Sequence, residues 1–322
     1  MKSHVVIGGS GFLGRHVVRS LMQRSDDVRV VDLTAFRPDR DGWSPKFTVA
    51  DLSSATPSDF DKILGGAEIV HHFAWSTIPQ TANADPAADL EVNLGITLRL
   101  LEAMRRRGGG TIIFPSSGGA VYGRLQTIPV PETHPLVPIS AYGASKAAAE
   151  MYLNIFRDLY GIDARVARIA NPFGAGQNPA KPLGVASTIA FRALASQSVE
   201  VWGSGNVIRD FIHVQDAVAG LLTLADASNL DRNVLPIYNI GSGIGASINE
   251  IIATVERHIG RPIPVLCKPE RAFDVPISVL DISRAKNDLD WSPVLNIDSG
   301  IEQMIVDLRA DPTRLFSSFQ VP

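Results

Sequence analysis

Residues 4–14 of this 322-residue chain read HVVIGGSGFLG and decide the first part of the fold. The apolar run from His4 to Ile7 predicts a buried parallel strand, and apolar positions between Phe12 and Gln23 recur at helical spacing. The glycines between them let the backbone pass close to a pyrophosphate, whose charge the free N–H groups and the positive end of the helix stabilise. This stretch therefore predicts a dinucleotide-binding turn.

An acidic residue, Asp32, closes the next apolar run, Val28–Val31. Its carboxylate can accept hydrogen bonds from the hydroxyl groups of an adenosine ribose, whereas the 2′-phosphate of NADP would meet a like charge there. A glycine pattern alone would also fit an ordinary turn between a strand and a helix. The strand, turn, helix and acid in this order therefore indicate a cofactor site that favours NAD over NADP.

The composition is that of a globular protein with a substantial core, with 45% hydrophobic residues and a formal net charge of −3. This charge gives no electrostatic reason to expect nucleic acid binding. The single cysteine, Cys267, has no disulfide partner, and His71-His72 lacks further ligands at metal-binding spacing, so we expect no metal site. The sequence contains no signal peptide and no membrane-spanning run, and we expect a cytoplasmic protein with no membrane partner.

Further strands are expected at residues 47–50, 69–73, 111–114 and 164–169, separated by helical or polar segments. This alternation predicts an α/β fold with a doubly wound parallel sheet of the Rossmann type. Long helices are expected at about residues 86–107 and 141–160. Because both carry more apolar surface than one sheet face requires, we expect them to pair across a homodimer.

Proline and glycine residues become frequent after Ile169, which indicates an irregular connection into a second region. We therefore expect residues 1–170 to form an NAD-binding Rossmann domain that also carries the catalytic residues. Residues 171–322 are expected to form mainly a smaller α/β substrate-binding region, and part of this chain could return to the sheet.

Tyr142 and Lys146 lie four positions apart in an expected helix, so their side chains share one face. A tyrosine titrates near pH 10, so acting as a base at neutral pH requires a pKa lower by roughly three units, or about 4 kcal/mol. A cation about 4 Å away supplies roughly this amount at an effective dielectric constant of about 20, and a positive nicotinamide ring would add to it. Such a pair also arises by chance, but here it follows the nucleotide turn and a strand that ends in Ser116-Ser117.

Together these motifs resemble the extended short-chain dehydrogenase/reductase family, and specifically its nucleotide-sugar epimerase branch, which UDP-glucose 4-epimerase typifies. The resemblance covers nearly the whole chain. The residues that carry it are the turn Gly8 to Gly14, Asp51-Leu52, His72-Phe73-Ala74, Asn93, the stretch SSGGAVYG from Ser116 to Gly123, the Tyr142/Lys146 pair, NPFG from Asn171 to Gly174, Gly203-Ser204-Gly205, RDFIHV from Arg209 to Val214, and Arg271 with Asp274.

The resemblance implies NAD as the cofactor and a nucleotide-diphosphate sugar, of the UDP-hexose type, as the substrate. The cofactor is expected to contact Gly8, Ser10, Gly11, Phe12, Leu13, Gly14, Asp32, Asp51, Leu52, Phe73, Ala74, Trp75, Asn93, Ser116, Tyr142 and Lys146. The substrate is expected to contact Thr77, Ser117, Gly118, Tyr142, Asn171, Val185, Trp202, Arg209, Arg271 and Asp274. Within this set the two arginines would grip the diphosphate, because guanidinium forks suit phosphate oxygens.

Three positions need separate comment. Relatives usually carry a Ser or Thr where this chain has Gly118, so the hydroxyl that meets the sugar would come from Ser117 or from a water molecule. Trp75 replaces a residue that is commonly small, and it would narrow the site or simply pack. Trp202 would flank the uracil or fill the core of the second region, and we favour the core.

The same stretch discriminates between reactions of the family. The sugar dehydratases and decarboxylases of this family carry acidic residues, which transfer a proton, at the positions where this chain has Gly119 and Ala120. Neither glycine nor alanine has a side chain that can act as an acid or a base, so this chain lacks that group. We therefore predict an NAD-dependent nucleotide-sugar 4-epimerase, with Tyr142 as the base, supported by Lys146 and Ser117. A keto-sugar reductase linked to NADP and a non-catalytic regulator that binds NAD and a nucleotide sugar are the alternatives.

Overall fold

The computed structural model describes residues 1–35, 44–177, 184–231, 233–269 and 275–310. Seven strands, all paired in parallel, form one sheet in the order β10-β6-β5-β4-β1-β2-β3. The order reverses direction between β1 and β4, as in doubly wound folds, so the predicted fold class is confirmed. The strands are β1 (Ser3–Ile7), β2 (Asp27–Asp32), β3 (Lys46–Val49), β4 (Ile69–His72), β5 (Thr111–Ser117), β6 (Asp163–Ile169) and β10 (Ile237–Ile240).

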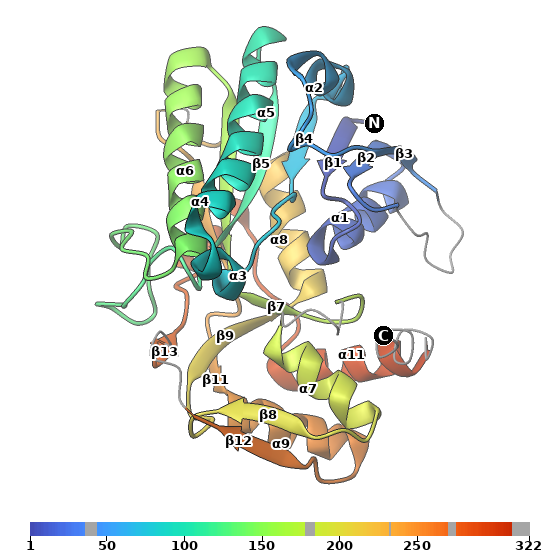
Figure 1. Ribbon diagram of the computed structural model, residues 1–322, viewed down its shortest axis with the longest axis vertical. Coiled ribbons are helices and arrows are strands. Elements are labelled where there is room, and N and C mark those ends of the chain that lie inside the picture. Colours follow the sequence, from blue (N-terminus) through green and yellow to red (C-terminus); the bar gives the residue numbers. More distant parts are fainter. Residues whose placement is uncertain (36–43, 178–183, 232, 270–274, 311–322) are drawn as a thin grey trace.

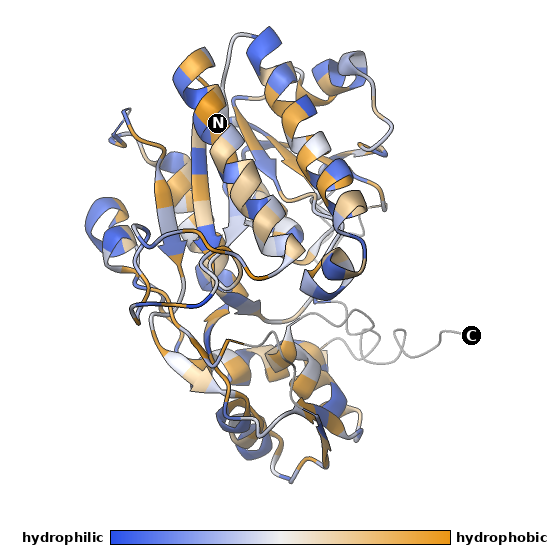
Figure 2. Ribbon diagram, turned by 60° about the vertical axis from the view of Figure 1, so that its left-hand side comes forward, coloured by the Kyte–Doolittle hydropathy of each residue, from blue (hydrophilic) through white to orange (hydrophobic). Residues whose placement is uncertain are grey.

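Helices cover both faces of this sheet, because alternate strand residues point to opposite sides. Val6 belongs to one apolar core, with α1, α8 and α10, whereas Val5 and Ile7 belong to the other, with α2, α5 and α6 (Figure 1). Each covering helix mixes hydrophobic and hydrophilic residues along its length, as one buried face requires (Figure 2). These helices are α1 (Phe12–Gln23), α2 (Pro57–Leu64), α5 (Gly95–Arg106), α6 (Ala141–Tyr160), α8 (Val214–Asp226) and α10 (Ser283–Leu289).

The prediction of a single helix over residues 86–107 is wrong, because the structure divides this segment into three helical pieces, α4, η1 and α5. After α3 (Pro79–Ala84), the chain forms α4 (Pro86–Asp89), a π-helical segment η1 (Leu90–Leu94) and then α5. The π-helical turn widens the helix at the point where Asn93 is buried. Such turns are frequent at functional sites.

The second region contains a small sheet of four strands, in which β9 pairs with β7, β11 and β13, and a separate pair of strands, β8 and β12. The helices α7, α9 and α11 share a third apolar core with β7, β8, β9 and β11. However, α8 returns to the large sheet (Figure 1), and β10 pairs with β6 at its edge, so the chain crosses between the regions more than once. The elements are β7 (Asn171–Phe173), α7 (Val185–Leu194), β8 (Val199–Trp202), β9 (Ile208–His213), β11 (Gly245–Ser247), α9 (Ile248–Ile259), β12 (Val265–Lys268), β13 (Ile277–Ser278) and α11 (Ile297–Ala310).

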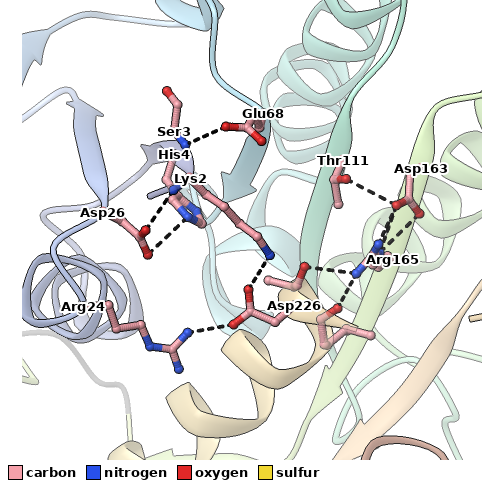
Figure 3. Close-up of polar contacts among 12 residues, drawn as sticks. Lys2, Ser3, His4, Arg24, Asp26, Glu68, Thr111, Asp163, Arg165 and Asp226 are labelled. Carbon is pink, nitrogen blue, oxygen red and sulfur yellow. Dashed lines mark hydrogen bonds and ion pairs between the residues drawn. The ribbon is translucent and has the colours of Figure 1, made fainter. Parts of the chain in front are cut away.

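A cluster of charged residues fixes α8 at the amino-terminal ends of the strands (Figure 3). Asp226, at the end of α8, pairs with Lys2 and with Arg24, each at 2.8 Å. Arg165 pairs with Asp163 and also donates to two backbone carbonyls in the last turn of α8. Cations near a helix C-terminus are stabilising.

A buried ion pair ties α6 to the sheet. Glu150 on α6 and Arg168 on β6 are each 3% exposed, and their closest atoms are 2.6 Å apart. Arg168 also donates to the Tyr122 hydroxyl at 3.0 Å, and the Ser116 hydroxyl at the end of β5 donates to Glu150. Helix α6 is therefore held against β5 and β6 by one connected set of polar contacts.

Replacing Arg168→Met should lower the free energy of unfolding by about 3–5 kcal/mol, because the Glu150 carboxylate would remain buried without its partner. Urea unfolding followed by circular dichroism measures this loss. The double variant Arg168→Met/Glu150→Leu should recover much of it.

The exposed pair of Lys46 and Asp27, 2.9 Å apart, provides the matched control. Lys46→Ala should cost less than about 1 kcal/mol, because solvent screens such pairs. An equal loss in the Arg168 and Lys46 variants would contradict the assignment of the buried pair.

Candidate active site

The glycine turn lies between β1 and α1, at the carboxyl ends of the parallel strands. Gly8 has a φ of +82°, and a Cβ atom there would lie 2.5 Å from the Ala74 backbone nitrogen. A Cβ atom on Gly14 would lie 2.3 Å from the Gly8 carbonyl oxygen. Glycine is therefore required at both positions. No side chain caps α1 at Gly11, so the first N–H groups of the helix remain available to an anion.

Asp32, the last residue of β2, is tied to the same turn. One carboxylate oxygen accepts a hydrogen bond from the Ser10 backbone N–H at 2.9 Å, and the other accepts from the Thr34 N–H at 3.1 Å. The turn thus combines backbone donors suited to a diphosphate with a carboxylate suited to ribose hydroxyls. These residues fit NAD.

Asp51 and Leu52 follow β3 but have different environments. The pKa of Asp51 is lowered by hydrogen bonds from the Ser53 side chain and backbone. Leu52 is buried in the core that contains Val31. The contact of both residues with an adenine stays a prediction.

Asn93 holds the segment that follows β4. Its side-chain oxygen accepts from the Ser76 N–H at 2.8 Å, and its amide nitrogen donates to the Thr77 hydroxyl at 3.0 Å and to Asp89 at 2.9 Å. The Thr77 hydroxyl also donates to Asp89. Asn93 is 1% exposed, and both ends of its amide are occupied. It therefore shapes the segment 73–77, and its own contact with the cofactor stays a prediction.

The structure brings Tyr142, Ser117 and Lys146 together. Helix α6 begins beside the end of β5, where the Ser140 side chain caps it by accepting from the Gly143 N–H at 3.2 Å. The Ser117 side chain lies beside the Tyr142 phenol, where it opposes the rise in pKa that burial causes. One turn along α6, Lys146 donates through Nζ to the Pro115 carbonyl oxygen at 2.8 Å. A phenol, a hydroxyl and an ammonium group thus meet at the carboxyl end of the sheet.

Burial, rather than the charge of Lys146, dominates the electrostatics of Tyr142 in this structure. Nζ of Lys146 lies 6.0 Å from the centre of the Tyr142 ring. Burial raises the pKa of Tyr142 to about 12, a hydrogen bond with Ser117 opposes the rise, and the charge of Asp89 adds to it. Burial also lowers the pKa of Lys146 to about 7, against the opposing charges of Glu150 and Asp89. Desolvation therefore outweighs the attraction that sequence spacing suggested.

Trp75 occupies the space next to this pair. Its ring centre is 3.8 Å from Nζ of Lys146, and its ring stands edge-on to Tyr142, with centres 6.4 Å apart. Trp75 therefore packs against the groups predicted to be catalytic. Phe73, Ala74 and Ser116 lie nearby in sequence at the ends of β4 and β5, and their contacts with the cofactor stay predictions.

The other residues predicted to bind the substrate lie in several elements of the second region. Asn171, on β7, donates to the Asp210 carbonyl at 2.9 Å, and Val185 opens α7. Arg209, on β9, donates to the Val275 carbonyl at 2.6 Å, next to the segment that contains Arg271 and Asp274. Those two residues lie outside the described part of the chain. The substrate contacts of this group stay predictions.

Trp202 differs from the sequence-based expectation. The residue lies at the end of β8 and is 39% exposed, so it does not fill the core of the second region. Val201, its neighbour on the opposite face of the strand, belongs to that core instead. A role for Trp202 beside a nucleotide base stays a prediction.

Three residues of the site escaped the sequence analysis. Glu150 stands four positions after Lys146 and Asp89 four positions before Asn93, so each shares a helix face with a residue that was identified. Phe114, at 4.5 Å from Nζ of Lys146, looked like an ordinary strand residue. Helical spacing could have identified the two acids, whereas Phe114 required the fold.

The two neighbouring histidines have structural partners. His72 shares a hydrogen bond with the Thr97 hydroxyl at 2.9 Å, and His71 stacks on His4. Burial lowers the pKa of each of these two residues, His71 and His72, to about 3, so both are neutral. In the described ranges, no group of three or more His, Cys, Asp or Glu side chains is arranged to hold a metal ion. Nor does any helix of the described ranges have the length and apolarity that crossing a membrane requires.

The chain is similar to known proteins over almost its full length. Residues 4–241 match the model of the NAD dependent epimerase/dehydratase family. A putative UDP-glucose 4-epimerase of Methanocaldococcus jannaschii is 33% identical over 304 residues, which cover 94% of this chain and 96% of that protein. A dTDP-4-dehydro-6-deoxyglucose reductase of Escherichia coli is 28% identical and covers 95% of this chain and 97% of the reductase.

Solved structures agree with this match. A UDP-glucose 4-epimerase of Thermotoga maritima with UDP-glucose has a TM-score of 0.88 and 31% identity, and the likeness covers 96% of this chain and 99% of that one. A UDP-glucose 4-epimerase of Thermus thermophilus in complex with NAD has a TM-score of 0.85, with the same identity and coverage. The prediction of NAD as the cofactor is confirmed. The chain therefore belongs to the NAD-dependent epimerase/dehydratase family, within the epimerase branch of the extended short-chain dehydrogenases and reductases.

Proposed function

We propose that this enzyme interconverts the C4 epimers of a UDP-hexose. The observation that carries the proposal is the meeting of the Tyr142 phenol, the Ser117 hydroxyl and the Lys146 ammonium beside the NAD-binding turn. The relatives named UDP-glucose 4-epimerase support the choice of sugar nucleotide. The absence of an acid at Gly119 and Ala120 supports epimerisation over dehydration.

In the proposed reaction, the side chains of this protein transfer one proton to and from the substrate. Tyr142, as phenolate, takes the proton of the sugar C4 hydroxyl and later returns it, and Ser117 lies beside the phenol that carries this proton. NAD, held by the turn between β1 and α1, would supply the hydride acceptance and hydride return that oxidation and reduction at C4 require. Because burial disfavours the phenolate, a facing cation is needed, and Lys146 is the cation that the chain itself provides.

Packing around Gly118 supports Ser117 as the hydroxyl that meets the sugar. A Cβ atom on Gly118 would lie 2.6 Å and 2.8 Å from the two terminal methyl carbons of Leu280. A serine at position 118 would therefore displace Leu280, which is 1% exposed. Gly119 is different, because a Cβ atom there meets nothing closer than 3.9 Å.

A one-way keto-sugar reductase is the second candidate, because one relative carries that name. It would use the same tyrosine and lysine. Asp32 disfavours it where NADPH is the reductant, because its carboxylate is fixed at the end of β2 by Ser10 and Thr34. A 2′-phosphate would meet this negative charge.

We also propose a homodimer that pairs the outer faces of the helices near residues 86–107 and 141–160. Five apolar side chains of α6 are exposed by more than a third of their surface, namely Met151, Tyr152, Ile155, Leu159 and Tyr160. They recur at intervals of one, three and four residues and therefore form one stripe on the helix. A contiguous apolar stripe on an outer helix is typical of a protein interface.

Proton NMR of the purified protein with a panel of UDP-hexoses tests the proposed reaction. We expect C4 epimers to form without added NADPH. Tyr142→Phe should lower kcat by roughly 10²–10⁴-fold, because the base is lost, and should still bind NAD. Tyr152→Phe, an exposed tyrosine on the same helix, should keep its activity.

Three other results would contradict the proposed reaction. Turnover that requires NADPH would favour the reductase. Binding of NAD and a nucleotide sugar without exchange at C4 would favour a regulator. Full activity of Tyr142→Phe would exclude Tyr142 as the base.

Gly118→Ala should lower the free energy of unfolding by about 1–3 kcal/mol, because the added methyl group overpacks against Leu280. Gly119→Ala, with open space around it, should change stability by less than about 0.5 kcal/mol. Chemical denaturation measures both. In the double variant Gly118→Ala/Leu280→Ala the two losses should be less than additive, and strict additivity would argue against this contact.

Size-exclusion chromatography with light scattering tests the dimer. The wild-type protein should have the mass of two chains, and Leu159→Glu should shift it to one chain, because a charge would be buried at the interface. Val306→Glu, on the exposed face of α11, is the control and should remain dimeric. A monomeric wild-type protein would rule the dimer out.

A further inference from the structure

Aromatic rings surround the ammonium group of Lys146. Nζ lies 3.8 Å from the ring centre of Trp75 and 4.5 Å from that of Phe114, and the Tyr142 ring centre is 6.0 Å away. The Trp75 ring stands at 61° to Phe114 and at 82° to Tyr142. The three rings are thus inclined to one another and face the ammonium from different directions.

This ammonium group has few polar partners for a buried charge. Lys146 is 4% exposed, and the hydrogen bond of its Nζ goes to the Pro115 carbonyl. Two carboxylates act on its charge, those of Glu150 and Asp89, but neither forms an ion pair with it in the part of the chain that the structure describes. A buried charge without a paired counterion is costly.

Most oxygens of the two carboxylates are committed to other groups. Both Glu150 oxygens accept from Arg168, and one also accepts from the Ser116 hydroxyl. One Asp89 oxygen accepts from the Thr77 hydroxyl and from the Asn93 amide, and the other is buried with no hydrogen-bond partner in the described residues. Asp89 therefore acts on Lys146 without an ion pair, whereas the ring faces of Trp75 and Phe114 lie directly against Nζ. The negative face of an aromatic ring attracts a cation, and tryptophan does so most strongly.

We propose that Trp75, with Phe114, is a positioning residue that holds Lys146 in its charged form beside Tyr142. The inference rests on the proposed role of Lys146 in epimerisation. A small residue at position 75, as the family resemblance leads one to expect, would leave the nearest face of the ammonium without this contact. In this chain the tryptophan thus belongs to the support of the Tyr142/Lys146 pair.

The charged and titratable groups around Lys146 determine the direction in which its pKa shifts when the aromatic rings are removed. Burial lowers the pKa of Lys146 to about 7, and Glu150 and Asp89 oppose this. His72, on β4, is neutral because burial lowers its pKa to about 3, and Tyr142 is protonated because burial raises its pKa to about 12. Since the rings favour the charged form, removing them lowers the pKa of Lys146 further. Lys146 then loses its proton at a lower pH.

Carbon-13 NMR of protein labelled at the lysine Cε atoms tests this directly. The Lys146 signal is assigned by its loss in Lys146→Met. In Trp75→Leu the titration midpoint of Lys146 should fall by about half to one and a half pH units, and Trp75→Phe should stay closer to the wild type. An unchanged or raised midpoint in Trp75→Leu overturns the proposal.

A second ring and a control variant make the test independent of one substitution. Phe114→Leu should also lower the midpoint, and it carries the test if Trp75→Leu does not fold. Trp291→Phe, a buried tryptophan in the core with α8 and α10, should leave the midpoint in place. A midpoint that falls equally in Trp291→Phe would show a general loss of packing and overturn the proposal.

The NMR titration needs no turnover, so its outcome is separate from that of the proposed reaction. Where the enzyme is active, the alkaline limb of the kcat profile should move to lower pH in Trp75→Leu, because Lys146 must be charged. A merely structural Trp75 would lower kcat equally at every pH and leave both midpoints unmoved. That result would overturn the proposal while the epimerase activity stands.

Discussion

The candidate active site depends on the buried pair of Glu150 and Arg168. Tyr142 and Lys146 lie about two turns and one turn before Glu150 on α6, so fixing Glu150 against β6 sets the direction in which both side chains point. The Ser116 hydroxyl joins the same pair, which places the neighbouring Ser117 against the phenol. Because desolvation offsets much of the attraction in such pairs, we infer that its main effect is to specify one arrangement of helix and sheet.

Burial sets the charge of this site as much as ionic attraction does. Burial raises the pKa of Tyr142 to about 12 and lowers that of Lys146 to about 7. The protein therefore favours the uncharged form of each side chain more than water does. Ionisation of the phenol then requires a cation in front of it, which couples base strength to what is bound. The Trp75 and Phe114 rings stabilise the positive charge of Lys146. Unlike a carboxylate, they do so without a negative charge that would keep Tyr142 protonated.

Much of the fold was predictable from apolar periodicity, and the site only in part. The bounds of α1 and α6 match the prediction, because both helices carry regular apolar spacing and end where glycine or a turn follows. The π-helical segment at Asn93 was not predictable, because it accompanies buried hydrogen bonds to Ser76, Thr77 and Asp89. Spacing placed Tyr142 and Lys146 on one face. It could not show that Lys146 turns toward Pro115 and the rings.

The position of β10 has a consequence for how the chain folds as it is synthesised. This strand covers one edge of β6, yet it follows β7, α7, β8 and β9 of the second region in sequence. Until the ribosome has released residues 237–240, the backbone N–H and C=O groups along that edge have no strand beside them. Unpaired edges are templates for association with other chains. A fragment that ended at residue 170 would therefore leave this edge of β6 without its neighbouring strand.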